Sequence, residues 1–420
     1  MLASLSKFRN PKYSLILGVL LVAMTLGYLG AYLGFARPRG FKGDFFAAMY
    51  NRGVWDGRGI FYGPLFVFER WVVDWVPSVA TIQFFAIGTL ILIILSMLVV
   101  MKIGKFQKRD NVYILLVWTL NTYLYYSFSV VSNPELIQLF FLILTWYGLS
   151  KENYPLAWIA LTLAALTKLI PFFLFPILLI FFSWTGFLAS ITIIIFTFII
   201  LSVGQSESIT TLMTQIIRMN TSSSGSNTAS PQPDSEQFLG LSSAIARLLG
   251  MRTGQDFTQV TTFSNLIIFI LYILILAVSI RISRSGVLQN QKVLTAYIFA
   301  LFMSLLPFMH LSQTHRHTFL YLTPVWVAMR FVYNQDPIQK RSDAFKRLTD
   351  FLYIASVFLP IYFLDFFNVD NLIGIRFGSQ FLPSLIMLTE PIWVNLVLVL
   401  SILYYGLLRT RRIRNSQFSL

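Results

Sequence analysis

Residues 263–280 read FSNLIIFILYILILAVSI, a run of 18 residues without one charged side chain. A run of roughly 17–25 apolar residues is long enough to cross the hydrocarbon core of a bilayer as an α-helix. Similar runs recur along the whole chain. We therefore expect an all-α polytopic membrane protein.

The composition agrees with this expectation. Of the 420 residues, 56% are hydrophobic, 16% are aromatic and only 12% are charged, with a mean hydropathy of +0.70. An ordinary soluble domain is about 25% charged. The chain has no cysteine, which excludes disulfides, thiol catalysis and thiolate metal sites. The first apolar run, Ser14 to Phe35, lacks a small-residue cleavage site and is expected to span the membrane rather than to act as a cleavable signal peptide.

Apolar runs predict about twelve transmembrane helices, within a range of 10–13. They lie near residues 14–35, 81–101, 111–129, 135–150, 154–168, 170–183, 186–203, 263–280, 292–309, 318–332, 350–366 and 391–408. We expect the run that contains Pro171 and Pro176 to be broken or re-entrant, because proline removes a backbone donor and clashes with the preceding turn.

The Lys and Arg residues are sorted by side in this arrangement. With a cytoplasmic N-terminus, 20 of the 32 lie in cytoplasmic segments and 12 on the opposite side, although the longer loops are on that opposite side. This is the positive-inside bias. It favours a cytoplasmic position for both termini. We expect a multi-pass protein of a bacterial plasma membrane. The net charge of +15 is then a sign of orientation and not of nucleic-acid binding.

We expect one multi-pass domain over residues 1–420, with long outer loops and a basic cytoplasmic tail at 409–420. The outer loop 36–80 has aromatic residues spaced as in two short interfacial amphipathic helices. The outer loop 204–262 contains a Ser/Gly/Pro-rich tract, predicted to be partly mobile, before a helical stretch, FLGLSSAIARLLG. This loop either gates a substrate or is a variable surface insertion.

Two acids in loop 36–80 are candidate catalytic groups. Asp44 follows the first span, where a carboxylate can act as a general base toward an attacking hydroxyl. It can equally be a solvated loop acid or a helix cap. Asp56 has the same two interpretations, in a less aromatic setting.

Lys168 lies in ALTKLIPFF, at the outer end of an apolar run and shortly before Pro171. A cation there is costly unless it is paired or reaches the interface, so it is a functional candidate with a phosphate as its natural partner. The alternative is a lysine that extends to the interface without a ligand.

All three histidines, His310, His315 and His317, fall in the sequence MHLSQTHRHTFLYLTP, together with Arg316. Phosphate binding or sugar positioning fits this cluster best. The three histidines do not have a familiar zinc-ligand spacing. A polar loop without a ligand is the remaining alternative. No nucleotide-binding, metalloprotease, hydrolase or nucleic-acid motif is present in the chain.

Further polar residues are secondary candidates. Asn133 and Glu135 begin the fourth span as helix-capping residues, with Gln138 one turn further in. Gln237 and Arg247 are polar positions of the predicted amphipathic helix in the loop 204–262.

Several segments occur in one order: GDFFAAMYNRG and GIFYGPLF, NPELIQLFFLILTWYGL, WIALTLAALTKLIPFFLFP, SEQFLGLSSAIARLLG and HLSQTHRHTFLYLTP. From about residue 40 to 330 the chain resembles the GT-C glycosyltransferases that use polyprenyl-phosphate sugars. It most resembles glycosyltransferase family 87, the polyprenyl-phosphomannose-dependent α-mannosyltransferases.

The resemblance implies roles for several residues. Asp44 corresponds to the general base of the family. Lys168 corresponds to the family's lysine that precedes a proline. A Ser-x-x-His-His-like element maps onto Ser312, His315 and His317, with Arg316 between the histidines. Where the family commonly has Tyr-Pro-Pro, this chain has Tyr62-Gly63-Pro64.

The implied reaction is one inverting displacement from a polyprenyl-phosphate sugar donor to a glycolipid or glycan acceptor at the outer face. Lys168, Arg52 and Arg316 would offset the charge of the departing phosphate, and neither a nucleotide nor a metal is implied. A secondary transporter, a flippase, a polysaccharide ligase and a non-catalytic scaffold are the alternatives. A transporter would show internal repeats and ionisable groups at mid-bilayer.

Overall fold

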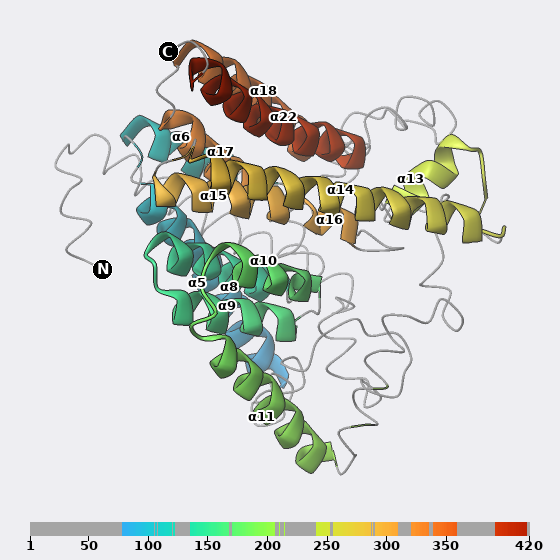
Figure 1. The fold of residues 1–420 in the computed structure, drawn as a ribbon. Helices are drawn as coiled ribbons and strands as arrows, with labels where there is room; N and C mark the ends of the chain where they lie inside the picture. Colours follow the sequence, from blue (N-terminus) through green and yellow to red (C-terminus); the bar gives the residue numbers. More distant parts are fainter. Residues whose placement is uncertain are drawn as a thin grey trace, which may run out of the picture. The chain divides into compact units, whose positions relative to one another are not determined.

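The computed structural model describes only part of the chain (Figure 1). The described residues are 78–104, 106, 108–119, 121, 135–167, 170–205, 210, 214, 241–252, 255–286, 288, 290–309, 321–335, 339–358 and 391–417. Over these ranges every regular element is a helix and none is a strand. The all-helical fold class is therefore confirmed for the described part of the chain.

The helices follow one another along the chain with short connections in several places. They are α5 (Ser78–Gly104), α6 (Lys108–Thr119), α8 (Glu135–Ser150), α9 (Tyr154–Thr167), η2 (Ile170–Leu174), α10 (Phe175–Phe181), α11 (Phe187–Gln205), α13 (Leu241–Leu248), α14 (Thr258–Ser285), α15 (Gln291–Met303), α16 (Leu306–Met309), α17 (Leu322–Asn334), α18 (Gln339–Phe358) and α22 (Pro391–Gln417).

Four stretches of the described helices are long and apolar enough to cross a membrane: Ile87–Gly104, Thr258–Ser285, Gln291–Phe308 and Ile392–Thr410. Four shorter apolar helices accompany them, at Leu136–Ser150, Tyr154–Thr167, Ile170–Phe181 and Phe187–Ile200.

Large apolar side chains are exposed along α14, where a soluble protein would carry polar groups. They are Phe263, Leu266, Phe269, Ile270, Ile273 and Leu274. At 1.5 Å per residue α14 is about 42 Å long, more than the roughly 30 Å of a hydrocarbon core. A lipid environment explains these exposed side chains, and the chain is a membrane protein.

The proline-containing run at residues 170–183 changes from a 3₁₀ turn to an α-helix, and whether it is re-entrant stays a prediction. Ile170–Leu174 form a 3₁₀ turn, and the α-helix begins only at Phe175. Pro176 occupies the first turn of α10, where its missing N–H would have no intrahelical partner in any case.

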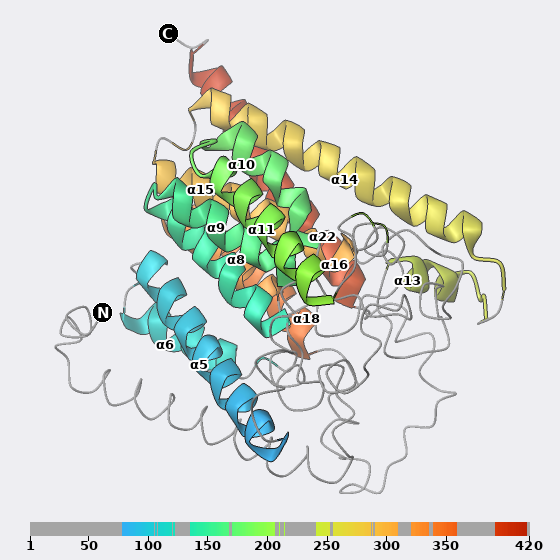
Figure 2. The ribbon, with the colours of Figure 1, turned by 90° about the horizontal axis from the view of Figure 1, so that it is seen from below.

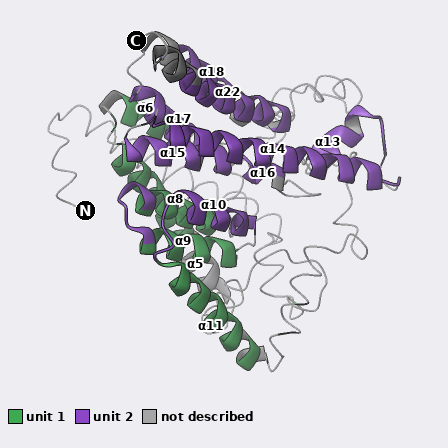
Figure 3. Ribbon diagram, in the orientation of Figure 1, with its two compact units in different colours: residues 1–148, 155–169, 186–216 green, residues 149–154, 170–185, 217–420 purple. Residues whose placement is uncertain are grey.

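The described chain divides into two compact units, shown in Figure 3. Unit 1 comprises residues 1–148, 155–169 and 186–216, and unit 2 comprises residues 149–154, 170–185 and 217–420. The described helices of unit 1 are α5, α6, most of α8, α9 and α11.

Unit 2 is built around a helical bundle. α15 packs on α17, α17 on α18, and α18 on α22, and the last two run side by side in Figure 1. α14 packs on α22 and α15, and Figure 2 shows it extending along the bundle. Gly406 of α22 makes this approach possible, because a Cβ there would collide with side chains of Ile282 and Tyr297.

Two helices extend further than the apolar pattern predicted. The span expected at 350–366 belongs to α18, which starts at Gln339, so much of the expected 330–349 connection is helical. The basic residues after 408 continue α22 as far as Gln417. Lys, Arg and Gln have good helix propensity, and hydropathy alone locates only the apolar part of a helix. The predicted helix in the loop 204–262 is confirmed as α13.

Candidate functional site

Most of the predicted site residues lie outside the described residues. These are Asp44, Arg52, Asp56, Tyr62, Lys168, Gln237, His315, Arg316 and His317. Glu135 and Arg247 are within helices: Glu135 is the first residue of α8, and Arg247 is the next-to-last residue of α13. The convergence of the acid, the lysine and the histidines on one cavity stays a prediction.

The α8–α9 hairpin contains one of these two described residues, Glu135. Its two helices run antiparallel and approach each other closely at Gly148, where an added Cβ would lie 2.7 Å from the backbone nitrogen of Ala157. Only glycine allows this approach, because any larger residue would push the two backbones apart.

Gln138 links the two helices at the other end of the hairpin. Its side chain is 1% exposed, and its Nε2 donates a hydrogen bond of 2.9 Å to the carbonyl oxygen of Ala164. The last four carbonyls of a helix have no intrahelical donor, and α9 ends at Thr167. Gln138 therefore supplies a donor to the last turn of α9 and fixes that turn against the first turn of α8.

This register sets the first residue of α8 beside the last residue of α9. Pairing Gly148 with Ala157 and Gln138 with Ala164 sets Glu135 at the level of Thr167. Thr167 is covalently bonded to Lys168. Glu135 and Thr167, the residue before Lys168 in the chain, thus lie at the same end of the hairpin.

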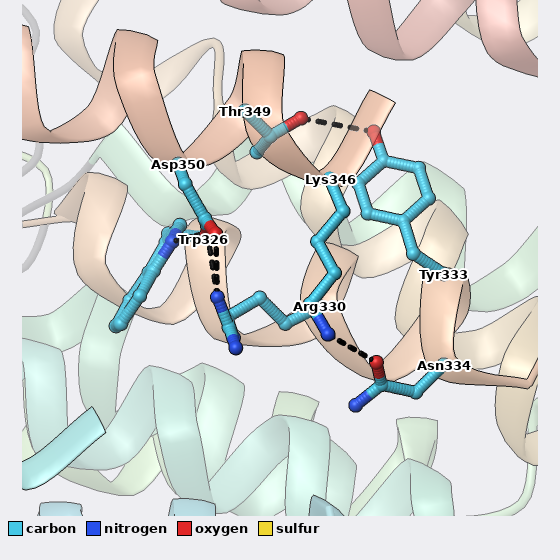
Figure 4. Close-up of polar contacts among 7 residues, drawn as sticks. All are labelled: Trp326, Arg330, Tyr333, Asn334, Lys346, Thr349 and Asp350. Carbon is cyan, nitrogen blue, oxygen red and sulfur yellow. Dashed lines mark hydrogen bonds and ion pairs between the residues drawn. The ribbon is translucent and has the colours of Figure 1, made fainter. Parts of the chain in front are cut away.

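The polar network in Figure 4 joins α17 and α18. Arg330 Nη1 donates to both carboxylate oxygens of Asp350, at 2.8 and 2.6 Å, and Trp326 Nε1 donates to Asp350 Oδ1 at 2.7 Å. The side chain of Arg330 is 6% exposed and that of Asp350 is 21% exposed. The guanidinium of Arg330 also lies 5.5 Å from the centre of the Trp326 ring.

Further contacts extend this network along both helices. Trp326 stacks on Tyr353 at 4.8 Å, and the Tyr353 hydroxyl lies 2.8 Å from Thr323 Oγ1. Toward the connecting turn, Lys346 Nζ donates to Asn334 Oδ1 at 2.7 Å, and Tyr333 and Thr349 hydroxyls lie 3.0 Å apart. Asp350 is held by a cation and an indole N–H, so its chemistry is that of a structural ion pair.

Sequence reasoning did not find the Arg330–Asp350 pair. One signal was present, since Trp326 and Arg330 are four residues apart and so share a helix face. The partner acid is on the next helix, and its identity depends on the length and register of the hairpin.

A second polar contact lies at the start of α14, where Asp256 precedes the membrane-crossing stretch and Thr258 is its first residue. The Thr258 hydroxyl donates to Asp256 Oδ1 at 2.6 Å, and the Thr258 backbone N–H donates to the same atom at 2.9 Å. These hydrogen bonds, the one from the Thr258 side chain first, hold the pKa of the Asp256 carboxyl below its ordinary value. A carboxylate at this end also interacts favourably with the helix dipole.

Metal binding by the histidines also stays untested. In the ranges described, no group of three His, Asp or Glu side chains is arranged to hold an ion, but all three histidines lie outside these ranges.

Comparison with known proteins identified no relative of this chain. The chain matches no protein-family profile, no curated protein sequence and no solved structure.

Proposed function

We propose that this protein is a GT-C-type glycosyltransferase that moves a sugar from a polyprenyl-phosphate donor to a glycolipid or glycan acceptor. The observation that carries the proposal is the order and common predicted sidedness of three motifs. These are the acidic, aromatic segment at 41–71, the lysine before Pro171, and the histidine cluster at 310–317. About twelve membrane spans, both termini in the cytoplasm and a site at the outer face of a bacterial inner membrane belong to the same proposal.

Asp44 is the proposed general base. The acceptor hydroxyl oxygen forms a bond to C1 of the donor sugar, while the bond from C1 to the phosphate oxygen breaks. The proton of the hydroxyl passes to the Asp44 carboxylate, and polyprenyl phosphate leaves with the bonding electrons. The configuration at C1 inverts, because attack and departure take place on opposite faces of the sugar.

Cations of the site stabilise the leaving group. Lys168, Arg52 and Arg316 are the proposed contacts of the donor phosphate, together with His315 or His317. A preformed cation is most effective where charge increases in the transition state, and here that place is the departing phosphate. The donor sugar is mannose or another hexose or pentose.

The α8–α9 hairpin supports the assignment of Lys168. A helix end held by a buried hydrogen bond is a rigid starting point for a residue that must meet a phosphate, and Gln138 provides that bond to the last turn of α9. Asp56, Tyr62, Glu135, Gln237 and Arg247 are secondary candidates for contacts with the substrates.

The test is transfer by the purified full-length protein from radiolabelled polyprenyl-phosphate mannose, glucose and arabinose. We expect Asp44→Asn to lower the transfer rate by about 10²–10⁴-fold, the usual contribution of a general base. Asp343→Asn is the matched control, because Asp343 is an exposed acid of α18 outside the proposed site, and it should transfer at the wild-type rate.

Two results would contradict the proposal. Wild-type transfer by folded Asp44→Asn protein would remove Asp44 as the base. Uptake of solute into proteoliposomes with no transfer from any of the three donors would favour a transporter.

A further inference from the structure

Four aromatic rings join the helices of unit 2 at one level of the bundle. Tyr405 of α22 lies 5.0 Å from Tyr333 of α17, 5.3 Å from Phe345 of α18 and 6.4 Å from Tyr297 of α15, measured between ring centroids. Gly406, the next residue, packs on Ile282 of α14. Five helices are therefore aligned at this level.

The alignment brings four basic helix ends together. At this level and beyond it lie the C-terminal ends of α14 and α22 and the N-terminal ends of α15 and α18. Their cations with described side chains are Arg281, Arg284, Lys292, Lys346, Arg347 and Arg409. We call this set the basic end.

The basic end is available to a ligand and is poor in acids. Arg281, Arg284, Lys292 and Arg347 are exposed. In the described parts of these four helix ends the only acids are Asp343 and Asp350, and Asp350 is bound to Arg330. A strong positive field at this end of the bundle follows.

An exposed apolar band borders the basic end. Leu348 and Phe351 of α18 are 40% and 67% exposed, and Tyr404 and Leu407 of α22 are 57% and 40% exposed. Apolar side chains and tyrosine just inside a layer of cations are the arrangement found where acyl chains meet lipid headgroups.

We propose that the basic end binds anionic phospholipid headgroups at the membrane surface. Arg side chains form paired hydrogen bonds to phosphate oxygens, and the adjoining apolar band contacts the acyl chains of the same lipids. A soluble anion would use the cations alone, so the apolar band selects the lipid. This inference does not depend on the proposed glycosyltransferase activity.

The test measures how the full-length protein in phosphatidylcholine vesicles selects between spin-labelled phosphatidylglycerol and spin-labelled phosphatidylcholine. We expect the wild type to favour phosphatidylglycerol, and the triple variant Arg281→Gln/Arg284→Gln/Arg347→Gln to reduce that preference by about fivefold or more, since one cation near an anionic surface contributes roughly that factor. High salt should reduce the wild-type preference in the same direction.

Single variants provide the matched comparison and avoid a large change in net charge. Arg284→Gln and Arg252→Gln each remove one exposed arginine, one at each end of α14. We expect Arg284→Gln to weaken the preference and Arg252→Gln to leave it unchanged.

Three outcomes would overturn the proposal. They are an unchanged preference in the triple variant, an equal loss in the two single variants, and abolition of the preference by soluble glycerophosphate at equal ionic strength. The last would indicate a site for free phosphate.

Discussion

Gln138 is a buried amide in a mainly apolar helix, and its Nε2 donates to the carbonyl oxygen of Ala164 in the neighbouring helix. Arg330 and Asp350 likewise link α17 and α18, through an ion pair. In an apolar environment a polar group without a partner is costly. Each of these side chains therefore specifies which helix lies beside which, and in what register.

Gln138→Leu tests the hydrogen bond at the hairpin end. It leaves the Ala164 carbonyl without this donor, so we expect the free energy of unfolding in detergent to fall by about 1–3 kcal/mol. Gln291→Leu is the control, because Gln291 is exposed, and a change within about 0.5 kcal/mol is expected there. Equal stability of Gln138→Leu and wild type would show that this bond does not hold the hairpin.

Asp350→Asn tests the ion pair. It leaves the buried Arg330 guanidinium without its counter-ion, and we expect a loss of about 3–5 kcal/mol in the free energy of unfolding. The double variant Arg330→Met/Asp350→Leu should recover most of that loss, because it removes both charges. An exposed acid on the same helix, Asp343, provides the control Asp343→Asn. A double variant less stable than Asp350→Asn would contradict a simple charge-pair account.

At the scale of elements, close helix approach depends on glycine at two positions. Gly148 lies against the backbone of Ala157, and Gly406 lies against Tyr297 and Ile282. Sequence patterns predicted most of the described helices, because apolar runs identify buried or lipid-facing helices. For α8 the predicted bounds, 135–150, were also correct. The same patterns missed the polar N-terminal part of α18 and the basic C-terminal part of α22, because a helix continues beyond its apolar part wherever the residues have sufficient helix propensity.

Gly148→Ala tests the close approach of α8 and α9. The added methyl group collides with the Ala157 backbone, so we expect a loss of about 1–3 kcal/mol in the free energy of unfolding. Gly88→Ala, in the interior of α5, meets nothing within 4 Å of the added carbon. It should be neutral or stabilising by up to about 1 kcal/mol. The same effect at both sites would contradict a role for close packing.

At the scale of the whole molecule, the distribution of Lys and Arg predicts the orientation in the membrane, and unit 2 gathers the basic helix ends that this orientation places in the cytoplasm. α14 has Arg252 before its start and Arg281 and Arg284 in its last turns. Arg252 and a residue at the basic end of unit 2 can therefore report the orientation directly.

Cysteine labelling checks the orientation, because the chain contains no cysteine of its own. In intact cells, a membrane-impermeant maleimide should label Arg252→Cys, and it should label Asp343→Cys only after permeabilisation. Both native residues are exposed in unit 2, so neither variant is protected by burial. The reverse pattern would invert the orientation and place the proposed site in the cytoplasm.

The sequence by itself predicted a helical membrane protein, as the described residues show, because the length and hydropathy of a run decide whether it can lie in lipid. It also determined the candidate chemistry, because Asp44, Lys168 and the histidines are identified by residue type and position along the chain. Only the tertiary structure decided that Gln138 binds the end of α9, that Arg330 pairs with Asp350, and that the basic ends of four helices meet. Those contacts depend on the register and alignment of packed helices, which the hydrophobic pattern of the sequence does not determine.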